Sequence, residues 1–354
     1  MTARALTSTL CSLLTLCFAS APLMADLETL IADTPSTQAK TARAKAAPKD
    51  YPWWLTPSSK RVPWLTGPLL TPSGHVVPAG HFNAEPYLFV NVGKGIYNAE
   101  WDSVSIPNFY NITTQQPLQF GLVKDWDFQF VPQFSWNHTD GASKWVLNDL
   151  PIATDYQVVS DRPGTWWPGV KMTLGLNLPI GKYQKLEAKK KGTDIGGSGS
   201  WAPALSLVMS RLFYFGNHHY FAPRFATTYT FQTPVHVKGF NSYGGGHGTH
   251  GKAFPGNKLA VLLGMEYTLT QQLALALDID YTHTDKSRFS GHRGRTAGVH
   301  NRVKLPSSEQ VSLAPAIEYN WSAYVGMIAG VWFTVAGRNS ADFINGVIAI
   351  NIYK

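Results

Sequence analysis

The chain has 354 residues, of which 44% are hydrophobic, 13% aromatic and 15% charged, and its formal net charge is +8. Beyond the N-terminus it contains no stretch of roughly 18 or more apolar residues, so helical membrane spans are not expected. The basic residues lack the pattern of a nucleic-acid-binding surface, and no nucleic-acid partner is expected. The many aromatic, Gly and Pro residues are typical of a chain of strands and turns, either a soluble sandwich or a membrane barrel.

Residues 1–25 have the organisation of a secretory signal peptide. A short apolar stretch at residues 10–19 is followed by small residues, with candidate cleavage points after Ala21 and Ala25. An uncleaved anchor helix, the alternative, would need a longer apolar stretch. Both cysteines of the chain lie inside this segment. The exported protein is therefore predicted to contain no disulfide and no zinc–thiolate site.

Residues 26–79 differ in composition from the rest of the chain. An Ala-, Lys- and Thr-rich part is followed by a Pro-rich part that contains three Trp residues. Because proline breaks the hydrogen-bond ladder of a sheet, we interpret this stretch as an irregular periplasmic extension. The sequence leaves open whether the extension enters the barrel as a plug.

Residues 80–354 show alternating apolar and polar positions in segments of about 10 residues, which is the signature of a membrane barrel strand. The clearest segment, residues 273–282, places Leu and Ile on one face and Ala and Asp on the other. The pattern predicts an all-β, transmembrane, antiparallel up-and-down β-barrel of about twelve strands. These strands are expected near residues 82–93, 115–124, 127–138, 149–160, 166–179, 200–213, 219–235, 257–267, 272–285, 308–319, 323–336 and 342–353.

Connections between these strands alternate between short and long. Outer-membrane barrels have short periplasmic turns and long extracellular loops, and an even number of strands returns both ends to the periplasm. The long connections are expected near residues 93–114, 139–148, 181–199, 237–256 and 286–307. The basic excess is assigned mainly to residues 40–60 and 182–191, which we interpret as solvated segments near anionic lipid headgroups.

A hairpin in the second half of the chain carries a family resemblance. Residues 169–181 read GVKMTLGLNLPIG, and a long loop separates them from Gly-Ser-Trp at residues 199–201. With this hairpin, residues 169–354 resemble the outer-membrane family described as putative MetA-pathway proteins of phenol degradation. The resemblance implies a porin-type transporter for small, often aromatic or apolar molecules, and it assigns no binding residues. The family's upstream Gly-x-Gly-Asp is absent, and the chain ends in Lys354 rather than in an aromatic residue.

Several charged and polar residues occupy the polar faces of the predicted strands. A Lys or Arg that faces lipid at the bilayer midplane costs about 2–4 kcal/mol, so these side chains should face the lumen and form a cross-barrel polar ladder. Such a ladder would either stiffen a narrow barrel or line a water-filled channel. The two strand Asp residues have no neighbouring nucleophile, so acid–base catalysis is not expected. The predicted lumen-facing residues are Glu85, Lys171, Asn177, Arg224, Glu266, Asp278, Asp280 and Glu318.

The pair His247 and His250 is the weak candidate for a metal site. A His-x-x-His pair needs rigid geometry and further ligands, whereas glycines surround this one. We therefore expect a solvated loop, no bound metal and no cofactor.

The sequence predicts an outer-membrane channel or facilitator for passive uptake of small molecules, and not an enzyme. The expected partners are outer-membrane lipid, lipopolysaccharide, the barrel assembly machinery and a small-molecule solute. An alternative is a structural or adhesive barrel that binds through its long loops. A phospholipase-like barrel enzyme is the third hypothesis, but the outward faces show no Ser and His for it.

Overall fold

The computed structural model describes residues 63–161, 165–217 and 219–354. The predicted signal peptide and residues 26–62 of the predicted extension lie outside the described residues. None of the helices in the described part of the chain is long and apolar enough to cross a membrane.

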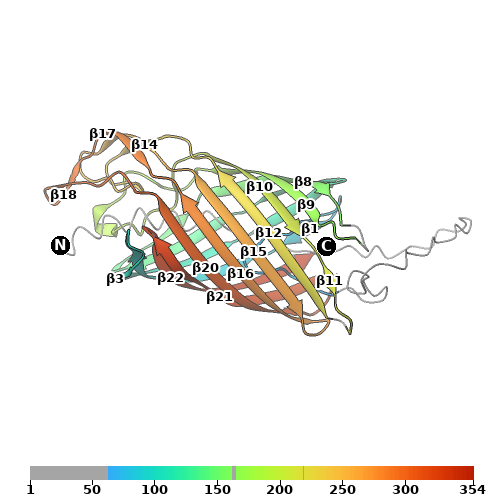
Figure 1. Ribbon diagram of the computed structural model, residues 1–354. Helices are drawn as coiled ribbons and strands as arrows, with labels where there is room; N and C mark the ends of the chain where they lie inside the picture. The colour runs from blue at the N-terminus through green and yellow to red at the C-terminus, as the bar shows by residue number, and fades with distance from the viewer. Residues whose placement is uncertain (1–62, 162–164, 218) are drawn as a thin grey trace, which may run out of the picture.

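The described residues form a closed antiparallel barrel of twelve wall strands, as predicted (Figure 1). Neighbours in the chain pair with each other, and β2 pairs with β22, so the wall has no free edge. Five wall strands are broken into two shorter strands. In chain order the wall consists of β1 and β2 (Phe82–Ala84, Tyr87–Tyr97), β3 and β4 (Ser103–Gln115, Leu118–Val123), β5 and β6 (Trp126–Phe130, Gln133–Thr139), β7 and β8 (Ala142–Leu147, Leu150–Val159), β9 (Gly169–Leu178), β10 and β11 (Ala202–Ser210, Phe213–Tyr214), β12 (Tyr220–Thr230), β15 (Lys258–Thr268), β16 (Leu273–Thr284), β20 (Ser308–Asn320), β21 (Val325–Arg338) and β22 (Ala341–Tyr353).

Two of the predicted long connections are wrong. Residues 93–114 are mostly strand, because β2 turns back at residues 98–102 and pairs with β3. Residues 139–148 contain a tight turn at Asp140 and Gly141, both with positive φ, which joins β6 to β7. The outer part of β3 exposes consecutive residues, so its sequence lacks the apolar alternation that marks a strand against lipid.

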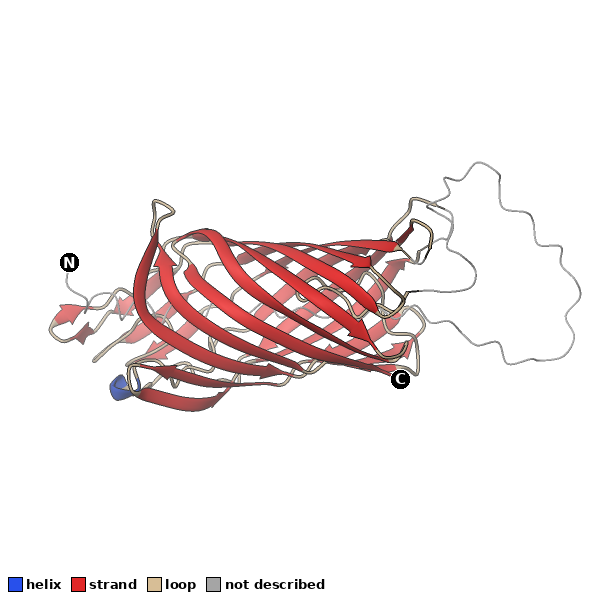
Figure 2. Ribbon diagram, turned by 90° about the horizontal axis from the view of Figure 1, so that it is seen from below, coloured by secondary structure: helices blue, strands red, loops and turns tan. Residues whose placement is uncertain are grey.

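The two ends of the barrel differ, as Figure 2 shows. One end carries short turns and the C-terminus, and we call it the short-turn end. The other, the long-loop end, carries the connections 179–201, 231–257 and 285–307. These connections contain β13 (Val235–Lys238), β14 (His250–Phe254) and β17 (Arg288–His292) in one small sheet, the hairpin of β18 (Arg295–Thr296) and β19 (Val299–His300), and a short 3-10 helix, η2 (Ala188–Lys190).

The wall strands present an apolar face outward. Large side chains such as Leu275, Ile317 and Ile348 are exposed on this outer face, as expected of residues that meet lipid. The inward face carries mostly small and polar side chains with a few large apolar ones such as Phe89 and Trp332, and Ala276 and Asp278 on this face are buried. The predicted alternation therefore places apolar side chains on the outer face and charged side chains on the inner face.

Leu277→Arg tests this orientation. Leu277 lies on the outward face near the middle of β16, so the substitution should lower the free energy of unfolding by about 2–4 kcal/mol in lipid vesicles. The matched control is Val299→Arg, on the exposed β18–β19 hairpin, which should change stability by about 0.5 kcal/mol or less. Equal effects of the two substitutions in urea unfolding would contradict the assigned outer face.

Candidate functional site: a segment held in the barrel lumen

Residues 63–79, which we call the lumenal segment, lie inside the barrel. Thr66 contacts the end of β20 at the short-turn end, Thr71 contacts the middle of β16, and Val77 contacts the start of β5. The segment therefore enters from the short-turn end, reaches mid-barrel and returns. Leu69, Leu70 and other residues of it are completely or almost completely buried.

Wall carboxylates accept hydrogen bonds from the backbone of the lumenal segment. The N–H of Thr66 donates to Glu318 Oε2 at 2.8 Å. Asp278 accepts three bonds: from the N–H of Leu70 at 3.0 Å, the N–H of Thr71 at 2.9 Å and the hydroxyl of Thr71 at 2.6 Å. Hydrogen bonds to a charged group contribute about 1.5–3 kcal/mol each. Asp278 is thus the strongest single anchor at the tip of the segment.

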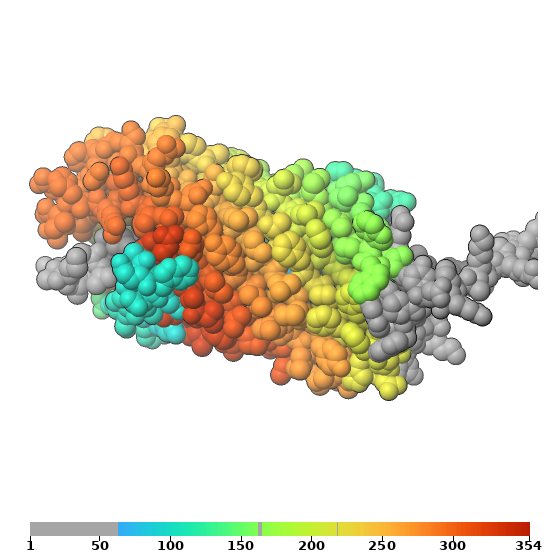
Figure 3. Space-filling view, viewed as in Figure 1, coloured from blue at the N-terminus to red at the C-terminus, as the bar shows by residue number. Residues whose placement is uncertain are grey.

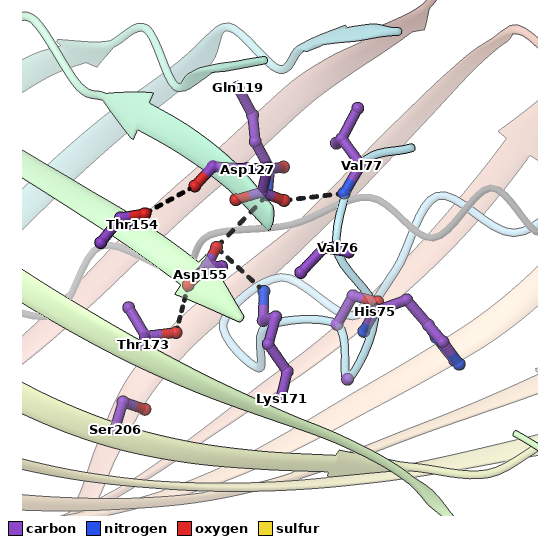
Figure 4. Close-up of polar contacts among 12 residues, drawn as sticks. His75, Val76, Val77, Gln119, Asp127, Thr154, Asp155, Lys171, Thr173 and Ser206 are labelled. Carbon is purple, nitrogen blue, oxygen red and sulfur yellow. Dashed lines mark hydrogen bonds and ion pairs between the residues drawn. The ribbon is translucent and has the colours of Figure 1, made fainter. Parts of the chain in front are cut away.

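A second anchor holds the returning arm of the segment. The N–H of Val76 donates to Gln157 Oε1 at 2.9 Å, and Gln157 Nε2 donates to the carbonyl of Gly74 at 2.8 Å. The N–H of Val77 donates to Asp127 Oδ2 at 2.7 Å (Figure 4). Gln119 Nε2 donates to the same carboxylate oxygen at 2.7 Å, which fixes the orientation of Asp127.

The tip of the segment packs on apolar side chains and against two glycines of the wall. Leu69 and Leu70 belong to the lumen's hydrophobic cluster, which also contains aromatic residues of β2, β21 and β22. A Cβ on Gly264 would lie 2.7 Å from Thr71 Cβ, and one on Gly330 would lie 2.7 Å from Leu69 Cδ1. Real Cβ atoms do not approach so closely, so Gly264 is needed for Thr71 to pack as it does. Gly330 also lies against the wall backbone, where a Cβ would be 2.3 Å from the carbonyl oxygen of Pro315.

The two most deeply buried cations among the described residues each pair with a carboxylate on the neighbouring strand. Arg224 Nη2 lies 2.6 Å from Glu266 Oε2, and both side chains are fully buried. Lys171 Nζ lies 3.3 Å from Asp155 Oδ2, and Thr173 also donates to Asp155 (Figure 4). Burial without such partners would cost several kcal/mol per charge, which explains the pairing.

Most of the predicted lumen-facing residues come together around the segment. Glu85 lies on the wall opposite Arg224 and within its electrostatic range, and its carboxylate accepts a hydrogen bond from Tyr87 at 2.9 Å. The charged residues of the wall therefore interact with each other across the lumen, with neighbouring strands, and with the segment. Seven of the eight predicted residues are buried, namely Glu85, Lys171, Arg224, Glu266, Asp278, Asp280 and Glu318.

Two predicted residues lie away from the segment. Asn177, half-buried near the long-loop end, donates to Asp149 Oδ2 at 3.3 Å. Asp280 accepts a hydrogen bond from the hydroxyl of Ser312 at 3.1 Å, one inward position beyond Asp278 on β16.

Sequence reasoning missed Asp127, Asp155 and Gln157, which complete the second anchor. The same period-2 rule that found Asp278 marks them, because Asp127 shares the inward face of Gln129, and Asp155 that of Gln157. No periodic signal marks the lumenal segment itself, because it forms no strand.

One of the connections at the long-loop end is bonded to inward-facing residues of the wall. Asp149 accepts hydrogen bonds from the N–H of Gly181 and of Ser198, each at 2.9 Å, which draws connection 179–201 inward. Asn137 Nδ2 donates to the carbonyl of Thr193 at 3.0 Å. Burial raises the pKa of Tyr243, so its hydroxyl stays protonated and donates to the Ser198 carbonyl at 2.7 Å.

The structure separates the two weak metal candidates. His247 packs edge-on against Phe240, whereas His250 stacks on His292 with ring centroids 5.3 Å apart. The Nδ1 atoms of His250 and His292 both contact the carbonyl of Gly248. Among the described residues no group of three or more His, Cys, Asp or Glu side chains is placed to hold a metal ion.

Comparison with known proteins relates the chain to other barrels by fold alone. No family model matches the sequence, and a search of curated proteins finds no similar sequence. Among solved structures, an outer membrane channel from Pseudomonas putida F1 superposes with a TM-score of 0.63 and 12% identity, covering 80% of this chain and 98% of that one. The beta domain of the Bordetella autotransporter BrkA superposes less well, with a TM-score of 0.43, 12% identity, and 77% and 99% coverage.

Proposed function

We propose that this protein is a non-enzymatic outer-membrane channel for the passive passage of small molecules, and that the lumenal segment is its plug. The short-turn end would face the periplasm and the long-loop end the outside. The plug would have to move for a solute to pass, because its tip occupies the middle of the barrel.

One observation supports this proposal above the others: the middle of the lumen is filled by a segment that is not part of the wall. A barrel that serves only as a scaffold can fill its interior with wall side chains. Here the aromatic side chains of β2, β21 and β22 share the lumen with the segment, and the wall around the tip of the segment presents small residues and carboxylates. The segment attaches to these carboxylates through hydrogen bonds. Such contacts can exchange for water, which would leave a polar passage.

The resemblance to the MetA-pathway family favours small aromatic or apolar molecules as the transported class. The outward apolar face and the closed wall favour insertion in the outer membrane, with lipid and lipopolysaccharide as neighbours and assembly by the barrel machinery.

Single-channel recording in planar bilayers tests the proposed function, with a disulfide that locks the plug. Thr66 Oγ1 lies 2.9 Å from Asn320 Oδ1 at the end of β20, so cysteines at these two positions can be joined, and the segment would then be tied to the wall at both of its ends. After removal of the predicted signal peptide, T66C/N320C would hold the only cysteines of the chain. We expect the oxidised double variant to lose openings and a reductant to restore them.

The single variants T66C and N320C are the controls, and their conductance should not change between oxidising and reducing conditions. Absence of ion steps in every form, together with binding of cells or surface polymers through the loops, would instead favour the adhesive alternative. Hydrolysis of phospholipid by the refolded protein would favour the enzyme.

A further inference from the structure

Positive charge is segregated to the long-loop end of the molecule. The connections 179–201, 231–257 and 285–307 contain thirteen Lys and Arg against three Asp and Glu, a net charge of +10. The whole chain carries only +8, so the remaining residues sum to −2. Connection 285–307 alone holds six of the thirteen cations and one of the three acids. Its atoms project from the long-loop end in Figure 3.

Within this connection the structure forms a pocket of about 420 Å³. Two arms of the connection make its walls and are tied together, since the N–H of Ser287 donates to the carbonyl of Leu305 at 2.9 Å and the N–H of Leu305 donates to Ser287 Oγ at 2.7 Å. The pocket is lined by Lys286, Ser287, Arg293, Arg302, Val303, Lys304, Leu305 and Pro306.

The lining combines four cations with an apolar floor. No carboxylate lines the pocket, and in the described part of the chain none of the four cationic side chains forms an ion pair. Val303 is buried, and Leu305 is half-buried beside it. Four like charges around one cavity repel one another, so an anion placed among them is favoured by all four.

We propose that this pocket captures a small organic anion, a carboxylate or phosphate ester on a flat apolar body, at the outer mouth of the channel. The volume suits such a molecule, because ligand pockets span about 300–1,000 Å³. The cations would hold the charged group while Val303, Leu305 and Pro306 cover the apolar body. The role in uptake rests on the proposed channel function, but binding itself does not.

The proposal specifies a free solute rather than the phosphates of lipopolysaccharide. The pocket lies within the loop assembly above the wall strands, because its lining residues fall between the end of β16 and the start of β20. Lipid phosphates approach a barrel from the side at the level of the headgroups. Binding of lipopolysaccharide at the pocket would therefore contradict the assignment to a free solute.

Equilibrium binding of benzoate to the refolded full chain tests the proposal without any need for conduction. We expect saturable binding by isothermal titration calorimetry, weakened by added salt because exposed charges are screened. The variant R302Q/K304Q should weaken benzoate binding about tenfold. Benzyl alcohol, similar in shape but uncharged, should not bind measurably.

The matched control is K189Q/K190Q, which removes the same charge from the long-loop end but leaves the pocket intact. It should bind benzoate as the wild type does. If both double variants weaken benzoate binding equally, benzoate is attracted by the overall positive charge of the long-loop end and not bound in the pocket. Absence of benzoate binding to the wild type would also overturn the proposal. If inorganic phosphate binds as tightly as benzoate, or purified lipopolysaccharide displaces benzoate, the pocket does not select a free apolar anion.

Discussion

Removal of residues 26–77 is expected to raise the single-channel conductance several-fold. The truncated chain would keep the predicted signal peptide and every wall strand, and the space of Leu69, Leu70 and Thr71 would fill with water. The wall carboxylates Asp278 and Glu318 would then be hydrated instead of bound to backbone N–H groups. A conducting path lined by these carboxylates should favour cations over anions.

The measurement is conductance and reversal potential in planar bilayers under a salt gradient. Asp278→Asn in the full chain weakens three hydrogen bonds at the tip of the segment, so it should open more often than the wild type but less than the truncated chain. A truncated barrel that folds but conducts no more than the wild type would contradict the assignment of the segment as the plug.

Arg224→Met should lower the free energy of unfolding by about 3–5 kcal/mol, the usual cost of leaving a buried charge without its partner. Arg224 and Glu266 lie 2.6 Å apart with both side chains fully buried, and Glu318 is close enough to add repulsion once the cation is gone. Urea unfolding in lipid vesicles, followed by tryptophan fluorescence, measures the change.

The double variant R224M/E266M should recover most of this loss, because an apolar pair of similar size replaces the ion pair. Arg338→Met is the matched control. Arg338 pairs with Glu309 at 3.1 Å between neighbouring strands, but both side chains are partly exposed, so its loss should cost about 1 kcal/mol or less. A large loss for Arg338→Met, or none for Arg224→Met, would contradict this account of the lumen.

Strand number and strand facing could be predicted from the sequence because both depend on local information. Leu275 and Asp278 lie on opposite faces of β16 by residue spacing alone, and lipid outside requires the apolar face there. The two mistaken connections lie at the long-loop end, where β3 and β7 each expose consecutive residues. In the outer part of β3 no apolar solvent imposes the alternation, so the pattern that marks a strand disappears.

What the lumen contains was decided only by the tertiary structure. Thr66 and Glu318 are 252 positions apart in the chain, and Leu70 and Asp278 are 208 apart, so no local pattern links them. The segment's backbone bonds go to side chains of the finished wall rather than to a neighbouring strand, and such partners exist only after the barrel has closed. The same is true of the cationic pocket, because hydrogen bonds between Ser287 and Leu305 bring its two arms together. Sequence by itself thus determined which residues face inward, whereas closure of the wall determined what they hold.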